Sequence, residues 1–453
     1  MPLRFREGSP EAFFFAFYTW GYDVSSTYGK HTAWLGGALC AALGLGLSGA
    51  SVHAEDTIAD ALNASKPILE SSLRAEDVDQ FGIANKANAL SWRNRLGFQS
   101  GDFNGFKLLI EVDNTSVLTG NYNSTLNGKT AYPTVLDPAV TEINRAQIAW
   151  TPTDTTTLTA GRQRIILDDA RFVGNAGWRQ DEQTMDGLRL DTTLWRVKLT
   201  AAYLNRINRV VGDAKDWNSN SYLLNAGYSV NEALKFTTFD YMLKFSTAAT
   251  APTPADATNA KASSVSIAGL RAYGSEWVSS FKLGYILQTA QEKNAGFNPN
   301  HFTLNEYMAE VNATYDIYTA KVNYESLGGN GTVGFVTPIG TTHAFQGWAD
   351  VFSASGGNKT LVNGIDDLSY GLTIAGHTKP WAPWIMNPTV TIIYHDLSTA
   401  RLNTDVGKEW DAMVTAGITK NLSITLKYAD FERANSAMPA SRNKTWIMFQ
   451  YKL

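Results

Sequence analysis

The sequence predicts an all-β protein, a single antiparallel transmembrane β-barrel of about 18 strands. Three observations lead to this prediction. Runs of about ten residues alternate between apolar and polar side chains, as membrane-spanning strands do. An apolar leader precedes these runs, as in exported proteins. Finally, Thr157–Leu190 crowds charged side chains between two strands, and a water-filled lumen holds such charges more readily than a dry core.

The alternation places apolar residues on one face of each segment and charged residues on the other. In 106–113, for example, Phe106 and Ile110 share one face, whereas Lys107 and Glu111 share the opposite face. Aromatic residues gather near the ends of such segments, which is typical of the interfacial girdles of membrane barrels. A soluble β-sandwich would also alternate. The barrel accounts better for the sequence, because the polar face is too charged for a sandwich exterior and the apolar face suits lipid.

Eighteen segments qualify as strands by this pattern. They are 68–77, 87–99, 105–114, 141–151, 156–166, 185–192, 194–205, 220–229, 233–245, 262–273, 276–288, 304–315, 318–327, 364–375, 388–397, 409–418, 421–432 and 442–453. Bacterial single-chain barrels have even strand numbers, and we expect both termini in the periplasm and the long loops outside the cell. A further alternating segment, His343–Phe352, would make the number odd, so it is assigned to a long loop, 328–363.

The first 54 residues are expected to be absent from the mature protein. Residues 30–54 combine a positive start, an apolar run and the small-x-small pattern that ends at Ala54, which is typical of a secretory signal peptide. The alternative, a transmembrane helix, fits less well because the run is short. Residues 1–29 fit no signal pattern and are interpreted as an upstream extension that is not native. Residues 55–453 form the barrel, and the one cysteine, Cys40, lies in the leader.

Several short sequence motifs, spread over nearly the whole of residues 55–453, resemble those of a known protein family. They are Leu73-Arg74-Ala75-Glu76, Ser91-Trp92-Arg93-Asn94-Arg95-Leu96-Gly97, Gly161-Arg162-Gln163-Arg164 with Asp168-Asp169, Phe345-Gln346-Gly347-Trp348-Ala349-Asp350, Glu409-Trp410-Asp411 and Lys427-Tyr428-Ala429-Asp430-Phe431. In these stretches the chain resembles the alginate-export family of outer-membrane β-barrel porins. The resemblance implies a monomeric barrel of about 18 strands that lets an anionic polysaccharide pass without energy input.

The alternation also predicts a charged substrate pathway along the lumen. Its candidate residues are Arg74, Arg93, Arg95, Glu111, Arg145, Arg162, Arg164, Asp168, Asp169, Arg189, Arg196 and Lys198. Arginine suits carboxylate ligands because its planar fork donates two hydrogen bonds at once. The alternative for each arginine is that it pairs with a neighbouring acid and only braces the wall. Arg162 and Arg164 share a phase with lipid-facing residues, so we expect a β-bulge at Gly161 to turn them inward.

The loop 328–363 is too long for a mere connector. We expect it to fold into the barrel and narrow the pore, with Trp348 packing and Asp350 pairing with an arginine of the lumen. The alternative is a flexible lid outside the cell.

The function predicted from these features is an outer-membrane channel of a Gram-negative bacterium. Its most favoured substrate is an acidic, alginate-like polysaccharide or oligosaccharide that moves through an arginine-lined lumen. The alternatives are a general or small organic-anion porin without sugar specificity, and a structural or adhesive barrel. An enzyme is disfavoured, because the sequence has no G-x-S-x-G motif, metal cluster or phosphate loop, and His301, His343, His377 and His395 have no catalytic context.

The expected partners follow from this location. They are outer-membrane lipid and lipopolysaccharide, the anionic substrate, and the barrel-assembly machinery, which would read the alternating C-terminal strand that ends at Leu453. We expect a monomer without a cofactor. The net charge of −4 gives no sign of nucleic-acid binding.

Overall fold

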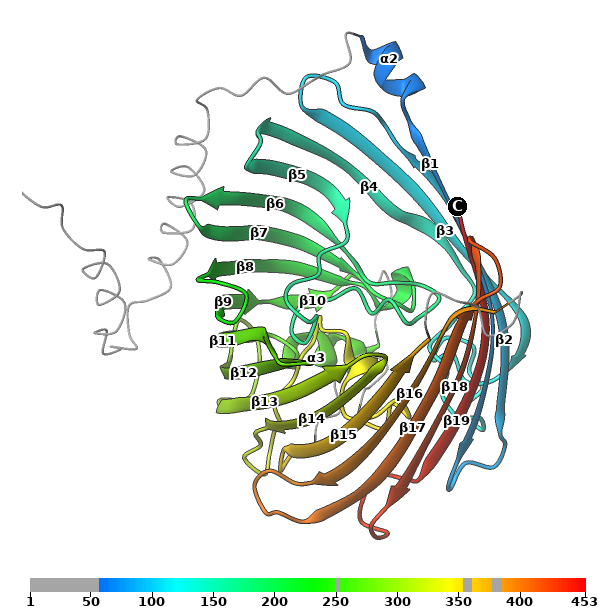
Figure 1. Ribbon diagram of the computed structural model, residues 1–453. Helices are drawn as coiled ribbons and strands as arrows, with labels where there is room; N and C mark the ends of the chain where they lie inside the picture. The colour runs from blue at the N-terminus through cyan, green and yellow to red at the C-terminus, as the bar shows by residue number, and fades with distance from the viewer. Residues whose placement is uncertain (1–56, 249–252, 353–360, 377–384) are drawn as a thin grey trace, which may run out of the picture. The chain divides into compact units, whose positions relative to one another are not determined.

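A computed structural model describes residues 57–248, 253–352, 361–376 and 385–453. The predicted signal peptide (30–54) and upstream extension (1–29) lie outside the described residues. The described strands form one antiparallel sheet that closes on itself, because β1 pairs with both β2 and β19 (Figure 1). Of the 19 strand segments, β9 and β10 are two pieces of one strand that both pair with β8, which leaves 18 (19 − 1) around the barrel. The predicted fold class is therefore confirmed.

The strands alternate in direction around the barrel, and each of the predicted segments overlaps one of them. Their bounds are β1 Lys66–Gln80, β2 Ala87–Gln99, β3 Phe106–Asn121, β4 Val140–Thr153, β5 Thr156–Gln163, β6 Thr184–Leu194, β7 Val197–Asn208, β8 Trp217–Ser229, β9 Lys235–Leu243, β10 Phe245–Thr247, β11 Val265–Val278, β12 Phe281–Asn294, β13 Thr303–Tyr315, β14 Tyr318–Leu327, β15 Ile365–Ala375, β16 Met386–Ser398, β17 Asp405–Gly417, β18 Leu422–Arg433 and β19 Arg442–Lys452. The residues 343–352 contain no strand; a short 3-10 helix, η5 (Thr342–Ala344), begins just before them.

The alternation of the sequence becomes an outer and an inner face of the barrel. In β3, Phe106, Leu108 and Ile110 point outward and are exposed, whereas Glu111 and Asp113 point inward and are buried. Since successive side chains of a strand point to opposite faces, the period of two sorts lipid-facing from lumen-facing residues along the whole strand.

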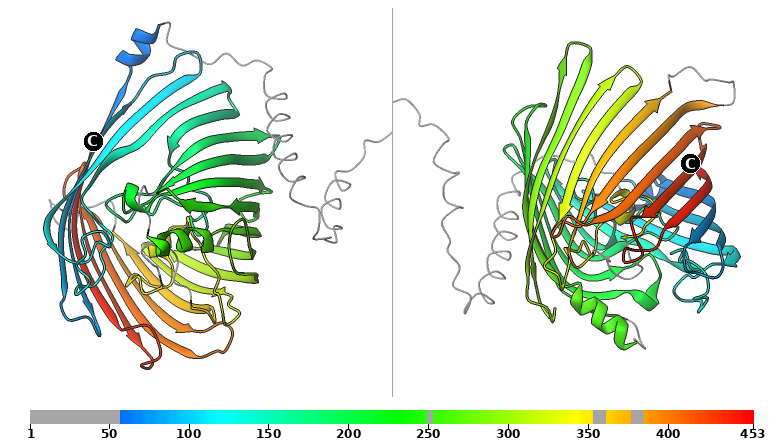
Figure 2. Two further views of the ribbon diagram at one scale, coloured as in Figure 1. Left: turned by 180° about the vertical axis from the view of Figure 1, so that it is seen from behind. Right: turned by 90° about the horizontal axis from the view of Figure 1, so that it is seen from below.

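The two ends of the barrel differ in their connections (Figure 2). Short turns, such as 154–155 and 316–317, join strands at one end, called the turn end below. Helix α2 (Ile58–Asn63) and the C-terminal residue of β19 lie at this end as well. The other end, the loop end, carries the longer connections, one of which contains helix α3 (Pro254–Ala262). None of the described helices is long and apolar enough to cross a membrane.

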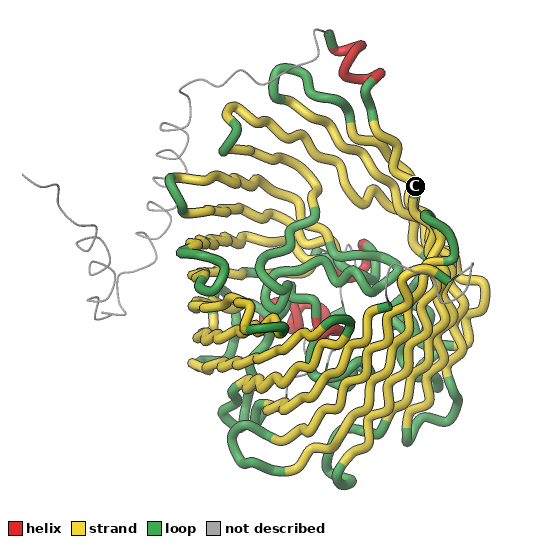
Figure 3. The backbone as a smooth tube through the Cα atoms, viewed as in Figure 1, coloured by secondary structure: helices red, strands yellow, loops and turns green. Residues whose placement is uncertain are grey.

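Two of the long connections lie inside the ring of strands (Figure 3). Inner loop A is 164–183, between β5 and β6, and inner loop B consists of the described residues 328–352 and 361–364, between β14 and β15. The loops pair with each other, because the backbone N–H of Gly174 donates to the carbonyl of Ile339, and that of Thr341 donates to the carbonyl of Ala170, each at 2.9 Å. They therefore act as one inner layer.

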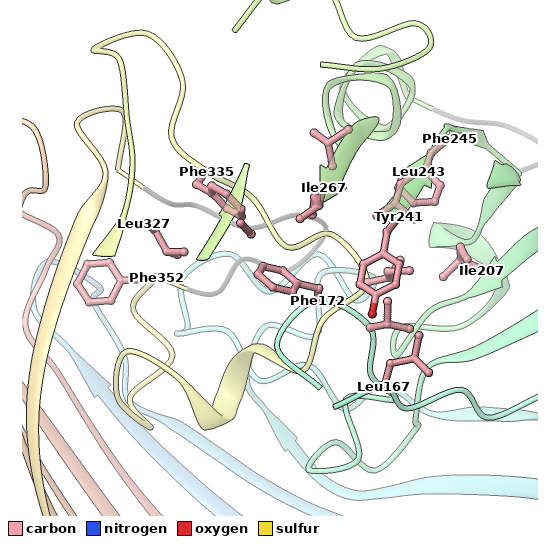
Figure 4. Close-up of a cluster of buried hydrophobic side chains, with 14 of the residues drawn as sticks. Leu167, Phe172, Ile207, Tyr241, Leu243, Phe245, Ile267, Leu327, Phe335 and Phe352 are labelled. Atoms are coloured by element: carbon pink, nitrogen blue, oxygen red, sulfur yellow. The ribbon is translucent and has the colours of Figure 1, made fainter. Parts of the chain in front are cut away.

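An apolar cluster joins the inner layer to one side of the wall (Figure 4). Phe172 of inner loop A contacts Phe335 of inner loop B, with ring centroids 6.1 Å apart, and Phe239 of β9 at 5.3 Å. Ile267 and Leu327 belong to the same cluster. Because these side chains fill the lumen beside β9, β11 and β14, the polar space lies nearer the opposite wall.

Candidate functional site

Carboxylates of the wall hold inner loop B in place. The backbone N–H of Ala349 donates to Glu409 Oε1 at 2.6 Å, and that of Trp348 donates to Asp411 Oδ2 at 3.0 Å. Glu292, on β12, accepts the N–H of Val336 at 3.0 Å. These three wall carboxylates are therefore occupied by the backbone of inner loop B.

Asp350 ties both inner loops to β19. It accepts hydrogen bonds from Arg179 Nη2 at 2.7 Å and Lys444 Nζ at 2.8 Å, and its other oxygen lies 2.8 Å from His343 Nδ1. Burial opposes ionisation of this carboxyl, but His343, Lys444 and Arg179 hold its pKa well below the usual range. The expected partner of Asp350 is an arginine of the lumen; the arginine that binds it, Arg179, belongs to inner loop A, and the wall adds Lys444.

A cavity of about 410 Å³ opens between the inner loops and strands β1, β2, β17, β18 and β19. Three cationic side chains line it: Arg93, Arg179 and Lys427. None of its lining residues, all of which lie in the described part of the chain, is an aspartate or glutamate. Apolar surface is supplied by Trp178, Trp348, Met413 and Met448. This space is called the cation cavity below; it combines positive charge with apolar walls.

Indole rings surround the ammonium group of Lys427. Its Nζ lies 3.7 Å from the ring centroid of Trp348, 4.3 Å from that of Trp178 and 5.6 Å from that of Trp446. Its hydrogen-bond partner is His343 Nε2, at 2.7 Å. Burial lowers the pKa of His343 to about 3, so the ring is neutral at physiological pH. Nε2 can then accept from Lys427 while Nδ1–H donates to Asp350.

Arg93 is the predicted wall arginine with the weakest partners. Its Nη atoms lie 3.5 Å from the carbonyl of Gln180 and 3.6 Å from Glu70, and its Nε has no hydrogen-bond partner among the described residues. Because Arg93 also lines the cation cavity, its guanidinium remains available to a ligand.

Two other predicted wall arginines are fully engaged by acids. Arg95 Nη2 donates to Asp113 at 2.6 Å and lies near Glu182, and Arg145 Nε donates to Glu111 at 3.0 Å. For these side chains the structure favours the alternative, in which an arginine only stabilises the wall.

Five further predicted residues also have partners. The pairs are Arg74 with Asp137, Arg164 with Glu182, Arg189 with Asp191 (2.7 Å), Asp169 with Arg271 (2.6 Å) and Asp168 with Asn225 (2.8 Å).

The prediction that Arg162 faces the lumen is wrong. Ala160, two residues before Arg162, pairs with the outward-facing Ile148. The strand register continues through Gly161 without a shift, so no bulge turns the side chain of Arg162 inward. Arg162 binds Asp186 on the outer face of the barrel. The glycine is required for another reason, since a Cβ there would lie 2.3 Å from a carbonyl oxygen of β4.

Arg196 and Lys198 also lie away from the cation cavity. Arg196 is in the turn between β6 and β7, where it donates to the carbonyls of Ser229 and Val230 at 3.0 Å. Lys198 is exposed close to the same turn. Both residues therefore belong to the turn end of the barrel.

Four cations that contribute most to the site were not among the predicted pathway residues. They are Arg179, Arg209, Lys427 and Lys444. The alternation of β18 does place Lys427 opposite its apolar face, so that residue could have been included. Arg179 and Arg209 lie in loops, where no periodicity signals the direction of a side chain.

The sequence matches no protein-family model and no curated protein. Solved structures do match. OccK2 (OpdF) of Pseudomonas aeruginosa is 16% identical, with a TM-score of 0.63, over 87% of this chain and 98% of that one. OccAB4 of Acinetobacter baumannii is 12% identical, with a TM-score of 0.62, over 86% and 98%. P. aeruginosa OpdK with vanillate is 14% identical, with a TM-score of 0.58, over 86% and 98%. At these identities the similarity establishes the fold, an 18-stranded closed barrel.

Proposed function

We propose that this chain is an outer-membrane channel for small organic anions. One observation carries the proposal: the cation cavity is lined by Arg93, Arg179 and Lys427 and by no carboxylate of the described residues. The wall acids Glu409 and Asp411 bind the backbone of inner loop B, and Asp350 pairs with Arg179. Among the described residues, no carboxylate forms a hydrogen bond with Arg93 or Lys427. Concentrated positive charge in a narrow passage lowers the entry barrier for anions.

The location and orientation of the channel rest on the barrel and on its neighbours in fold. The outward face is apolar, and OpdK, solved with vanillate, is an outer membrane protein of P. aeruginosa. We infer that the turn end, where β1 begins and β19 ends, faces the periplasm and that the loop end faces outward, as in bacterial barrels generally.

A small anion suits the cation cavity better than an acidic polymer. Its volume of about 410 Å³ is that of a pocket for a small molecule. The apolar walls of Trp178, Trp348, Met413 and Met448 favour an anion with an apolar body, such as vanillate. No family model supports the alginate-export resemblance, so passage of an acidic polysaccharide is the second candidate function.

The Lys427→Gln variant tests the proposal in planar bilayers. We expect vanillate to interrupt the current of the wild-type channel, and the variant to bind vanillate about 10- to 100-fold more weakly, because a charged hydrogen bond contributes about 1.5–3 kcal/mol. The measurement is the dependence of current block on vanillate concentration, with the uncharged vanillyl alcohol and a uronate oligomer as comparison solutes.

Lys408→Gln is the matched control. It removes the same charge from an exposed position on β17 and should leave the block unchanged. Equal block of wild type and Lys427→Gln by vanillate would contradict the proposed site. Block by the uronate oligomer alone would favour the polysaccharide reading instead.

A further inference from the structure

The carboxylate of Asp181 is buried without a group that neutralises it. The residue lies in inner loop A, it is 0% exposed, and neither of its oxygens accepts a hydrogen bond from another described residue. The charges that act on it most strongly belong to Glu142, Asp113, Asp216 and Glu182, and all of these are negative. Since a buried charge is costly without a partner, such a carboxylate requires either a proton or a cation.

The arginines of this part of the barrel are bound by other acids. The pairs are Arg95 with Asp113 (2.6 Å), Arg164 with Glu182 and Arg206 with Asp216 (2.8 Å). Within the described part of the chain, neither Asp181 nor Glu142 forms an ion pair. The region therefore keeps negative charge that its own cations do not compensate.

Neutral oxygen atoms of the same region also lack hydrogen-bond partners among the described residues. Asn144 donates with its Nδ2 to Glu182 at 2.8 Å, which leaves its Oδ1 without a donor. Thr184 and Asn208 lie opposite each other on β6 and β7, and the Oγ1 of Thr184 and the Oδ1 of Asn208 are likewise unpartnered. The side chains of Asn144, Thr184 and Asn208 are at most 1% exposed. Carboxylate, amide and hydroxyl oxygens without donors are the ligands that a hard cation prefers.

A gap in the wall gives this region access to the outer side of the barrel. β5 ends at Gln163, where the chain turns inward, so β4 has no partner among the described strands on this side beyond the pair of Ala146 with Arg162 (Figure 1). A cavity of about 900 Å³ lies at this gap and is lined by Glu142 of β4. Glu142 also pairs with the lumen-facing Asp113 of β3. An ion can therefore reach Glu142 from the outer surface near the loop end.

We propose that a calcium ion binds between inner loop A and β4, with the carboxylates of Asp181 and Glu142 as its charged ligands. The described residues contain no ready group of three acidic or histidine ligands, so the oxygens of Asn144, Thr184 and Asn208, together with water, complete the shell. Calcium accepts about six to eight oxygens in a flexible geometry, whereas magnesium requires a near-ideal octahedron. Because Asp181 is close in sequence to the residues of inner loop A that line the cation cavity, the ion would fix that part of the loop.

Titration of the purified, chelator-treated barrel with calcium tests this site by calorimetry and thermal unfolding. We expect a single ion to bind, and saturating calcium to raise the unfolding temperature in detergent by about 3 °C, since a ligand of the folded state stabilises it. Asp181→Asn and Glu142→Gln should each bind calcium at least about tenfold more weakly, because a charged ligand becomes a neutral one. In chelator, Asp181→Asn should unfold at or above the wild-type temperature, which would show that this variant folds.

Asp405→Asn is the control for the titration. It neutralises an exposed carboxylate at the start of β17 and should keep the wild-type response to calcium. If calcium leaves the wild type unchanged, Asp181 is buried as a neutral acid and the site is wrong. If Asp181→Asn and Glu142→Gln respond as the wild type does, calcium binds elsewhere, which also overturns the site. Neither result decides the proposed channel function, because that function is tested by vanillate block.

Discussion

Asp350→Ala is expected to release inner loop B and to produce a wider, less stable channel. The substitution removes the carboxylate that accepts hydrogen bonds from both Lys444 and Arg179, so that these buried cations keep only Glu76 as a partner among the described acids. It also removes the partner of His343. Removing one partner of a buried ion pair costs about 3–5 kcal/mol. We expect a single-channel conductance at least about twice that of the wild type and a lower thermal unfolding temperature in detergent.

Asp405→Asn provides the control for this experiment. It neutralises an exposed carboxylate at the start of β17, at the loop end of the barrel. We expect neither the single-channel conductance nor the unfolding temperature to change. A wild-type conductance for Asp350→Ala would show that Asp350 does not hold the loop.

Two adjacent acids of inner loop A are expected to respond to neutralisation in opposite directions. Asp181 is fully buried, and neither of its carboxylate oxygens has a hydrogen-bond partner among the described residues. Burial, followed by the charges of Glu142 and Asp113, raises its pKa well above the usual value. Asp181→Asn should therefore stabilise the folded barrel at neutral pH by about 1–3 kcal/mol, because an asparagine avoids the cost of protonating the carboxyl, or of burying its charge, on folding.

Glu182 has the opposite environment. It accepts from Asn144 at 2.8 Å and from Asn175 at 2.6 Å, and it binds Arg164 and lies near Arg95. Burial opposes its ionisation, but Arg95 and Arg164 lower its pKa from 4.5 to about 2. Glu182→Gln should therefore destabilise the fold by about 3 kcal/mol at neutral pH.

The pH dependence gives each acid a distinct signature. The contribution of Glu182 is complete above pH 4.5 and is lost as the pH falls from 4.5 to about 2. The contribution of Asp181 is fully present below its usual pKa and is lost progressively as the pH rises from there through the raised folded-state pKa. Denaturant unfolding of both variants from pH 3 to 9 measures this. A shift of the same sign for both variants at neutral pH would contradict the assignment.

The strands could be predicted from the sequence because their signal is local. A period of two fixes both the strand and the face of each residue, so the alternation of β3 and β18 placed Glu111 and Lys427 inward. Arg162 lies on the outer face, as the alternation alone predicts, because Gly161 forms no bulge. The glycine instead permits a close approach of two backbones.

The cation cavity could not be predicted in the same way. An arginine of the wall is available to a ligand only if no acid pairs with it. The pairing acid can lie far away in the sequence, as Asp137 does for Arg74. The environment of Lys427 comes from Trp178 and Trp348, which lie on two different inner loops. Loop conformation carries no periodic signal, so these contacts depend on the tertiary fold alone.

The reversal potential of the purified channel in a potassium chloride gradient tests the central claim most directly. The chain has a net charge of −4, so its overall charge would not attract anions. If Arg93, Arg179 and Lys427 control the passage, chloride should permeate more readily than potassium, and Lys427→Gln should reduce this preference. A cation-selective or unselective wild-type channel would contradict the account.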